Sequence, residues 1–178
     1  VCGKITLLRQ VAGFDKPDSG RILIGDSVVS SATTHVPPER RRIGIVFQSY
    51  ALWPHMSVAE NVAYGLTVTG GKCAERSRRV DAALDLVNLN GYAQRMPAML
   101  SGGQRQRVAL ARCLVTEPAL VLLDEPLANL DVHLRAAMEN EFARFHERTG
   151  TTMVYITHDQ AEAMALADRI AVMDNGRL

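Results

Sequence analysis

Long apolar runs and a signal peptide are both missing from the sequence. No run of apolar residues approaches the roughly 20 that an α-helix needs to span a bilayer. No charged segment followed by an apolar stretch and a small-residue cleavage site is visible either. We therefore expect any role at a membrane to depend on partner proteins that span it.

An excess of charge of one sign is missing too. The sequence has 20 Lys and Arg residues against 19 Asp and Glu residues, a formal net charge of +1. Because a nucleic-acid-binding domain usually carries a clustered basic face, we expect no nucleic-acid partner. The short basic runs at residues 40–42 and 76–79 are expected to be solvated surface, with a dedicated anion site as the less favoured alternative.

Cysteines are few and scattered. The three cysteines, Cys2, Cys73 and Cys113, form no C-x-x-C pair, and their number is odd. This pattern indicates neither a zinc site nor a disulfide framework. It fits the reducing environment of the cytosol.

Both ends of the sequence fall inside structural or functional elements. The chain opens in the middle of a motif without an initiator Met, and residues 175–178 form a turn followed by the start of a strand. We therefore interpret residues 1–178 as a single domain that is truncated at both ends. With 47% apolar residues, this length is enough to bury a sizeable core.

Apolar runs and turn residues predict an α/β fold. Runs that are apolar on both faces predict buried strands of a parallel sheet at residues 43–47, 119–123, 151–156 and 169–173. A hairpin is predicted where residues 20–24 and 28–29 flank a Gly-Asp turn. Helices are predicted at residues 4–12, ending at Gly13, around residues 80–87, and after residues 101–103. The class is therefore α/β, with a helical insert around residues 58–97.

Gly3 and Lys4, followed by a helix, match the end of a G-x-x-x-x-G-K-[ST] phosphate loop. Glycine lets backbone N–H groups approach phosphate oxygens, and the helix N-terminus adds partial positive charge. The lysine neutralises the β and γ phosphates of a nucleotide. On its own this pair is weak evidence, and a surface lysine is the alternative interpretation.

Residue 5 departs from this pattern. The loop needs Ser or Thr after Gly-Lys, because that hydroxyl binds Mg²⁺, and here the position holds Ile5. Three interpretations stay open. The sequence contains an error or a decayed codon, or the protein binds nucleotide and hydrolyses it poorly, and these two have equal weight. The third, that Thr6 partly substitutes, has less weight because Thr6 would point in a different direction on a helix.

The strand at residues 119–123 leads into two adjacent carboxylates, Asp124 and Glu125. Asp124 is placed to hold Mg²⁺, directly or through water. Glu125 is placed to polarise an attacking water as a general base. Removing two neighbouring carboxylates from water is costly, so we do not expect them to be packing residues of the core. A solvated turn after a strand is the alternative.

Residues 100–104 are Leu-Ser-Gly-Gly-Gln and begin a predicted helix. A serine and two glycines at a helix start form an anion site, although Ser-Gly-Gly alone would also fit a plain N-cap. Together with Leu-Leu-Asp-Glu-Pro shortly after it, this segment resembles the signature motif of ATP-binding-cassette (ABC) proteins. The resemblance covers the whole chain. It implies a P-loop NTPase core with a parallel sheet, an antiparallel β element near the N-terminus and a helical subdomain at about residues 58–113.

The resemblance also assigns roles to residues. Gln48 is similar to the Q-loop glutamine and His158 to the switch histidine, which would hold the γ-phosphate and the attacking water. Residues 129–131 are similar to the D-loop, with Ala128 where serine is more usual. A histidine that caps the following helix is the alternative for His158. The implied cofactors are ATP and Mg²⁺. The implied metal ligands are Asp124 and Gln48, and the implied catalytic residues are Glu125 and His158. The implied nucleotide-binding residues are Cys2, Gly3, Lys4, Ile5, Thr6, Gln48, Ser101, Gly102, Gly103, Gln104 and Asp131.

The family resemblance implies partners as well. Two such domains, here expected to be a homodimer, meet head to tail, so that Lys4 of one copy and residues 101–104 of the other would clasp one ATP. Residues 36–40, 47–58 and 157–163 are similar to the importer branch, which includes ferric-iron, spermidine/putrescine, sulfate, phosphonate and sugar importers. The form of residues 52–56 is most similar to ferric-iron and polyamine members. The region from Gln48 to Val58 would contact membrane permease subunits at the cytoplasmic face of the inner membrane, and a solute-binding protein would act indirectly.

Three function classes follow from these observations. The first is an ATPase coupled to solute import. The second is a nucleotide-binding but hydrolytically impaired subunit, which Ile5 motivates and an intact Glu125 and His158 argue against. The third is a soluble cassette ATPase acting on DNA or ribosomes, which would typically carry coiled-coil inserts or tandem cassettes that this sequence does not have.

Overall fold

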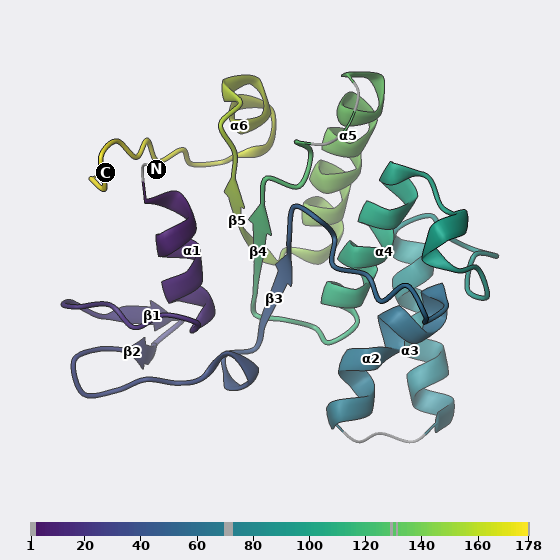
Figure 1. Cartoon of the computed structure of the whole chain (residues 1–178), viewed down its shortest axis with the longest axis horizontal. Helices are drawn as coiled ribbons and strands as arrows, with labels where there is room; N and C mark the ends of the chain where they lie inside the picture. The colour runs from purple at the N-terminus through teal and green to yellow at the C-terminus, as the bar shows by residue number, and fades with distance from the viewer. Residues whose placement is uncertain (1–2, 70–72, 129, 131, 178) are drawn as a thin grey trace.

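The computed structural model describes residues 3–69, 73–128, 130 and 132–177. A three-stranded parallel sheet forms its centre, with β4 between β3 and β5 (Figure 1). The strands are β3 (Ile43–Val46), β4 (Leu120–Asp124) and β5 (Thr152–Ile156). The predictions of parallel strands at residues 43–47, 119–123 and 151–156 are confirmed.

Strand β4 is buried on both of its faces. Successive side chains of a strand point to opposite sides of the sheet, so Leu120 and Leu122 lie on one side and Val121 and Leu123 on the other. The first pair packs with Leu8 of α1 (Lys4–Ala12), and the second pair belongs to the larger core on the opposite side. This two-sided burial explains why β4 is a continuous apolar run rather than an alternating one.

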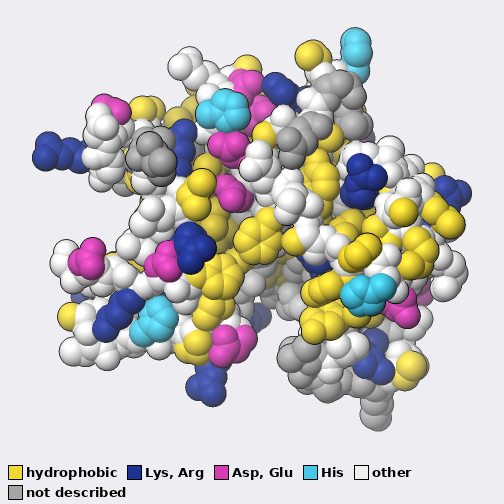
Figure 2. Space-filling model, viewed as in Figure 1, with side chains coloured by type: hydrophobic (Ala, Val, Ile, Leu, Met, Phe, Trp, Pro, Cys, Tyr) yellow, Lys and Arg dark blue, Asp and Glu magenta, His cyan; other side chains and the backbone are white. Residues whose placement is uncertain are grey.

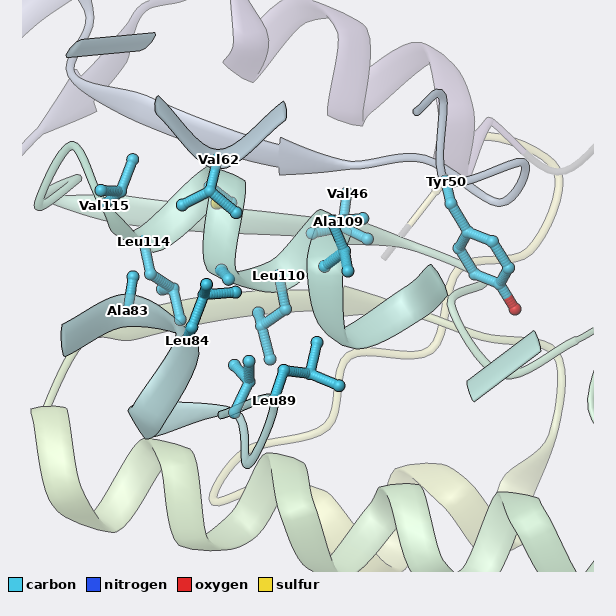
Figure 3. Close-up of a cluster of buried hydrophobic side chains, with 14 of the residues drawn as sticks. Val46, Tyr50, Val62, Ala83, Leu84, Leu89, Ala109, Leu110, Leu114 and Val115 are labelled. Atoms are coloured by element: carbon cyan, nitrogen blue, oxygen red, sulfur yellow. The ribbon is translucent and has the colours of Figure 1, made fainter. Parts of the chain in front are cut away.

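A group of three helices lies beside the sheet. Helices α2 (Val58–Thr69), α3 (Cys73–Leu86) and α4 (Gly102–Leu114) pack on one another, and α4 also packs against β3. Figure 3 shows Val62, Leu84 and Leu110 meeting from these three helices in one buried cluster. Helix α1 lies on the other side of the sheet from α2, α3 and α4 (Figure 1).

The remaining elements connect these layers. Strands β1 (Ile22–Ile24) and β2 (Ser27–Ser30) form the predicted antiparallel hairpin. Helix α5 (Val132–Thr149) joins β4 to β5, and α6 (Gln160–Leu166) follows β5. Two short 3-10 turns span Pro38–Arg40 and Pro97–Met99. None of the helices in the described ranges combines the length and apolar character that crossing a bilayer requires.

The prediction of a strand at residues 169–173 is wrong. Those residues form no regular element, and no strand in the described part of the chain pairs with them. Ile170 and Val172 are 48% and 78% exposed. An apolar run without a neighbouring strand has no partner for its backbone N–H and C=O groups, so it does not form a ladder. The segment lies instead beside the start of α1, where a Cβ on Gly3 would come within 3.4 Å of Met173 Sδ.

The buried side chain of Arg41 holds the C-terminal end of α1 in place. The guanidinium of Arg41 donates to the carbonyls of Gln10 and Val11 in the last turn of α1, at 2.7 and 2.8 Å. It also donates to the carbonyls of Val36 and Val29, at 2.7 and 3.2 Å. The burial lowers the pKa of Arg41. A cation at a helix C-terminus also complements the helix dipole, so Arg41 ties α1 to the β2 region.

Candidate nucleotide-binding site

The carboxyl ends of the three parallel strands bring the predicted site residues to one edge of the sheet. Asp124 is the last residue of β4 and pairs in register with Ile156, which directly precedes the turn that holds His158. Gln48 follows β3 by two residues. Figure 2 shows acidic side chains together with a histidine over the region where β4 and β5 end.

The N-terminus of α1 opens onto the same edge. Gly3 caps the helix with φ 93°, a left-handed conformation that glycine adopts without strain, and no side chain caps the first turn. The Nζ atom of Lys4 donates to the backbone carbonyl of Thr157 at 2.7 Å. Lys4 therefore reaches across from α1 to the turn after β5, and no side chain in the described ranges caps the start of α1.

Ile5 and Thr6 are both exposed in the first turn of α1. Ile5 is 50% exposed, and its side chain offers no atom that can ligate a metal. Successive residues of an α-helix are about 100° apart around its axis, so the hydroxyl of Thr6 faces a different direction from residue 5. That Thr6 is the less favoured substitute for a hydroxyl at residue 5 stays a prediction.

The acidic pair lies at the end of β4 in a strained turn. Glu125 has φ 44°, which non-glycine residues rarely adopt, and strain of this kind is concentrated at functional sites. Its N–H donates to the carbonyl of Ile156 at 3.0 Å, and its carbonyl accepts from the N–H of Ala128 at 3.2 Å. Burial, and then the neighbouring charge of Glu125, raise the pKa of Asp124. A bound cation would relieve both effects, so this pair is a suitable oxygen-donor set for Mg²⁺.

Glu125 and His158 lie next to each other. Glu125 Oε1 is 3.3 Å from His158 Nδ1, and the imidazole is 71% exposed. The alternative that His158 caps the following helix does not hold, because the side chain of Asp159 accepts from the N–H groups of Ala161 and Glu162 at the start of α6. The candidate general base and the candidate switch histidine are therefore in contact within one chain.

The signature segment forms a complete N-cap. Ser101 Oγ accepts from the N–H of Gln104 at 3.3 Å, and Gln104 Oε1 accepts from the N–H of Ser101 at 2.9 Å. This is a capping box at the start of α4. The Nε2 atom of Gln104 also donates to Tyr92 Oη at 3.2 Å. Gly102 and Gly103 occupy the first turn of α4, directly after this N-cap.

The structure does not bring the signature segment to the phosphate loop. Helix α1 packs with Leu120 and Leu122, whereas α4 belongs to the core on the other side of the sheet, with Val121 and Leu123. Figure 1 shows the two helices on opposite sides of the sheet. Lys4 and Ser101 of the same chain are therefore not placed to hold one phosphate group.

The segment after Gln48 is strained and is clamped by α4. Gln48 is exposed, while Tyr50 and Ala51 both have positive φ, at 61° and 46°. The guanidinium of Arg112 donates to both of their carbonyls, at 2.9 and 2.7 Å. It also stacks 4.7 Å from the ring centroid of Trp53. The sequence predictions missed Arg112, which looks from its place in α4 like an ordinary helix residue.

A buried amide holds the next part of this segment. Asn61 is fully buried on α2, and its Oδ1 accepts from the N–H of Trp53 at 2.9 Å. Its Nδ2 donates to the carbonyls of Trp53, Met56 and Ser57, at 3.1, 3.0 and 3.0 Å. The sequence predictions missed Asn61, because the same helix also holds Glu60, Thr67 and Thr69 as polar residues.

Two predicted nucleotide-binding residues, Cys2 and Asp131, lie outside the described residues. Of the other predicted residues, Lys4, Asp124, Glu125 and His158 gather at the edge of the sheet, and residues 101–104 do not join them.

Known proteins are similar in sequence to this chain over almost its full length. The sequence pattern described as ABC transporter matches residues 2–128. The chain is 51% identical over 177 residues to the sn-glycerol-3-phosphate import ATP-binding protein UgpC 2 of Agrobacterium fabrum, covering 99% of this chain and 46% of that protein. It is 51% identical over 177 residues to the maltose/maltodextrin import ATP-binding protein MalK of Salmonella typhimurium, covering 99% of this chain and 47% of that protein.

Solved structures share the fold. The structure of cbiO1 from Clostridium perfringens, described as part of the ABC transporter complex cbiONQ, aligns with a TM-score of 0.89 at 33% identity, covering 99% of this chain and 70% of that chain. The dimeric post-hydrolysis structure of the ATP-binding cassette MJ0796, bound to ADP and Pi, aligns with a TM-score of 0.81 at 32% identity, covering 98% of this chain and 78% of that chain.

The fold and the site define a P-loop NTPase domain of the ATP-binding-cassette type. The chain belongs to the ABC transporter family. It spans about half the length of the curated relatives that it matches.

Proposed function

We propose that this chain is the ATP-binding and ATP-hydrolysing part of a subunit that powers solute import through an ABC transporter. One observation carries the proposal. Lys4, Asp124, Glu125 and His158 come from three separate parts of the sequence and meet at one edge of the sheet, where Lys4 contacts the turn of His158 and His158 contacts Glu125.

Each of these residues has a role in phosphoryl transfer. Lys4 and the N–H groups at the start of α1 bind the β and γ phosphates. Glu125 accepts a proton from the attacking water as general base. His158, next to Glu125, holds that water and the γ-phosphate in line. Phosphoryl transfer depends mainly on such positioning and on charge stabilisation.

The chain supplies only some of the ligands that a magnesium ion is expected to have at this site. Asp124 and Gln48 would hold it, and the raised pKa of Asp124, caused by burial and then by Glu125, marks a carboxylate that gains from a nearby cation. When bound, Mg²⁺ would neutralise charge on the phosphates. Ile5 contributes no ligand, so we infer that water completes the coordination at that position.

We propose that the complete site needs a second copy of this domain. The signature segment, Ser101 to Gln104, lies on the opposite side of the sheet from Lys4, so one chain cannot offer both to one nucleotide. The dimeric form of the structural neighbour MJ0796 supports this arrangement. In a head-to-tail homodimer, Ser101 of one copy and Lys4 of the other would clasp the same ATP.

The permease would contact the region from Gln48 to Val58. The clamps by Arg112 and Asn61 give this segment a defined shape outside the sheet. The ring of Trp53 packs against the partly exposed ring of Tyr64, with 4.3 Å between the ring centroids and a tilt of 39°, and provides an apolar surface. We further propose that residues 58–113 form a helical subdomain that carries this surface together with the signature segment. The protein would then lie at the cytoplasmic face of the cell membrane, and a solute-binding protein would act through the permease.

The relatives bear on the identity of the transported solute. The two curated relatives described above are named for import of sn-glycerol 3-phosphate and of maltose, and neither is named for ferric iron or a polyamine.

The hydrolytically impaired alternative rests on Ile5 alone. The contact between Glu125 and His158 weighs against it, because a subunit that only binds nucleotide has no use for a general base.

A complementation assay tests the proposed function. In the full-length protein, Lys4→Met should remove phosphate binding and Ser101→Arg should block the signature segment, so that each variant alone has no ATP turnover. A mixture of the two forms heterodimers with one intact composite site, so turnover should reappear. Turnover by the Ser101→Arg variant alone at the unmodified rate would contradict the shared site.

A further inference from the structure

The turn at residues 157–159, here called the switch turn, joins β5 to α6 and contains His158. The imidazole is 71% exposed, and its contact with Glu125 is 3.3 Å long. A side chain with so much exposed surface is held only weakly by packing. The position of His158 therefore depends on how the backbone of the switch turn is fixed.

The side chains on either side of His158 fix that backbone. Thr157 Oγ1 accepts from the N–H of Asp159 at 2.9 Å and donates to Glu162 Oε2 at 2.8 Å. Asp159 Oδ1 accepts from the N–H groups of Ala161 and Glu162, at 2.8 and 3.3 Å. The two residues that flank His158 are thus bound to the first turn of α6.

A buried acid lies at the centre of these contacts. Glu162 is only 4% exposed, and its Oε2 accepts from Tyr155 Oη at 3.2 Å as well as from Thr157. Burial and the neighbouring carboxylate raise the pKa of Tyr155, so the phenol stays protonated and remains a donor. A buried carboxylate is costly to hold unless a cation pairs with it.

Arg135 of α5 supplies that cation and contacts three separate groups. Its Nη1 donates to Asp159 Oδ2 at 3.2 Å, and its Nε is 3.7 Å from Glu162 Oε1. Its Nη2 donates to the carbonyl of Leu130 at 3.4 Å. Leu130 lies in the segment that leads from Glu125 to α5. A single guanidinium therefore touches both acids beside the switch turn and the backbone that follows the candidate general base.

We propose that Arg135 is a positioning residue that acts through the switch turn to hold His158 beside Glu125. The proposal rests on the proposed ATPase function. The planar guanidinium offers N–H groups in several fixed directions, so it can donate to Asp159 and Leu130 while its charge lies 3.7 Å from Glu162. The single ammonium group of a lysine could not keep all three contacts.

Hydrogen exchange tests the positioning without depending on catalysis. In the full-length protein, Arg135→Gln should speed exchange of the amides of Asp159, Ala161 and Glu162 and leave those of β4 unchanged. Arg144→Gln is the matched control, since Arg144 is an exposed arginine on the same helix. Equal exchange at residues 157–162 in both variants would overturn the proposal, whatever their turnover.

Steady-state kinetics separate a positioning role from a general structural one. Arg135→Gln should lower kcat for ATP about tenfold and change KM by less than about threefold, because Lys4 and α1 still bind the nucleotide. In a His158→Ala background the same substitution should cause no further loss, since the residue through which Arg135 acts is gone. An equal loss in both backgrounds would overturn the proposal. If no form turns over ATP, including Ile5→Ser, the proposed function fails, and the exchange result alone decides whether Arg135 fixes the switch turn.

Discussion

Lys4 Nζ donates a hydrogen bond of 2.7 Å to the backbone carbonyl of Thr157. This bond joins the start of α1 to the turn that holds His158, two segments that are more than 150 residues apart in the sequence. The acceptor is a neutral carbonyl. A charged phosphate oxygen is a stronger acceptor, so a bound nucleotide would compete with Thr157 for the same ammonium group. We therefore expect nucleotide binding and the position of His158 to be linked through Lys4.

The first prediction concerns Lys4. Lys4→Met should weaken ATP binding at least about tenfold, because the ammonium that neutralises the phosphates is lost. Equilibrium binding of a fluorescent ATP analogue measures this. Lys16→Met, at an exposed lysine away from the site, should bind as the unmodified protein does. Equal affinity of the Lys4 and Lys16 variants would contradict the phosphate-binding role.

The second prediction concerns the unusual residue of the phosphate loop. Ile5→Ser should lower the Mg²⁺ concentration needed for half-maximal ATP turnover, because it adds the hydroxyl ligand that Ile5 lacks. Ile5 is 50% exposed, so the free energy of unfolding should change by less than about 0.5 kcal/mol. A magnesium titration of turnover and a urea melt check both statements. An unchanged magnesium dependence would show that residue 5 does not face the metal.

The third prediction concerns the anchor of α1. Arg41→Met should lower the free energy of unfolding by about 3 kcal/mol, because several charge-assisted hydrogen bonds are lost and buried carbonyls are left without a donor. Arg40→Met, at the exposed neighbouring residue, should change it by less than about 0.5 kcal/mol. Urea denaturation followed by circular dichroism measures both. A loss below about 1 kcal/mol at Arg41 would mean that water replaces the guanidinium.

The fourth prediction concerns the packing of β3 against α4. A Cβ on Gly44 would overlap the Sγ atom of Cys113, so Gly44→Ala should destabilise the fold by about 2 kcal/mol through overpacking. Adding Cys113→Ala removes the overlapping atom and should restore most of that loss. A double variant no more stable than Gly44→Ala alone would place the strain elsewhere.

The sequence predicted the sheet edge and its acidic pair well because those signals are local. The apolar run before Asp124 predicts a buried strand, whereas the order of the strands is known only from the structure. Residues 169–173 show the limit of this reasoning. Their composition matches a strand, but a strand also needs a neighbour, and composition says nothing about the neighbour.

The residues that fix the site could not be identified in the same way. Arg41, Arg112 and Arg135 each donate to a backbone carbonyl or an acid that is at least 24 residues away in the sequence. Asn61 donates to carbonyls that precede it by four to eight residues. Nothing in their local sequence distinguishes them from exposed polar residues. Only the folded structure shows which carbonyls they meet, so these roles depend on tertiary contacts that periodicity and motifs do not encode.

The most direct test of the central claim is Mg²⁺-dependent ATP turnover by the full-length protein, measured beside its Glu125→Gln variant. The proposed general-base role predicts measurable turnover by the unmodified protein and a loss of at least about 100-fold in the variant, with ATP binding retained. Turnover by Glu125→Gln at the unmodified rate would contradict the assignment of Glu125. Absence of turnover in the unmodified protein, with turnover restored by Ile5→Ser, would contradict the claim that this chain hydrolyses ATP.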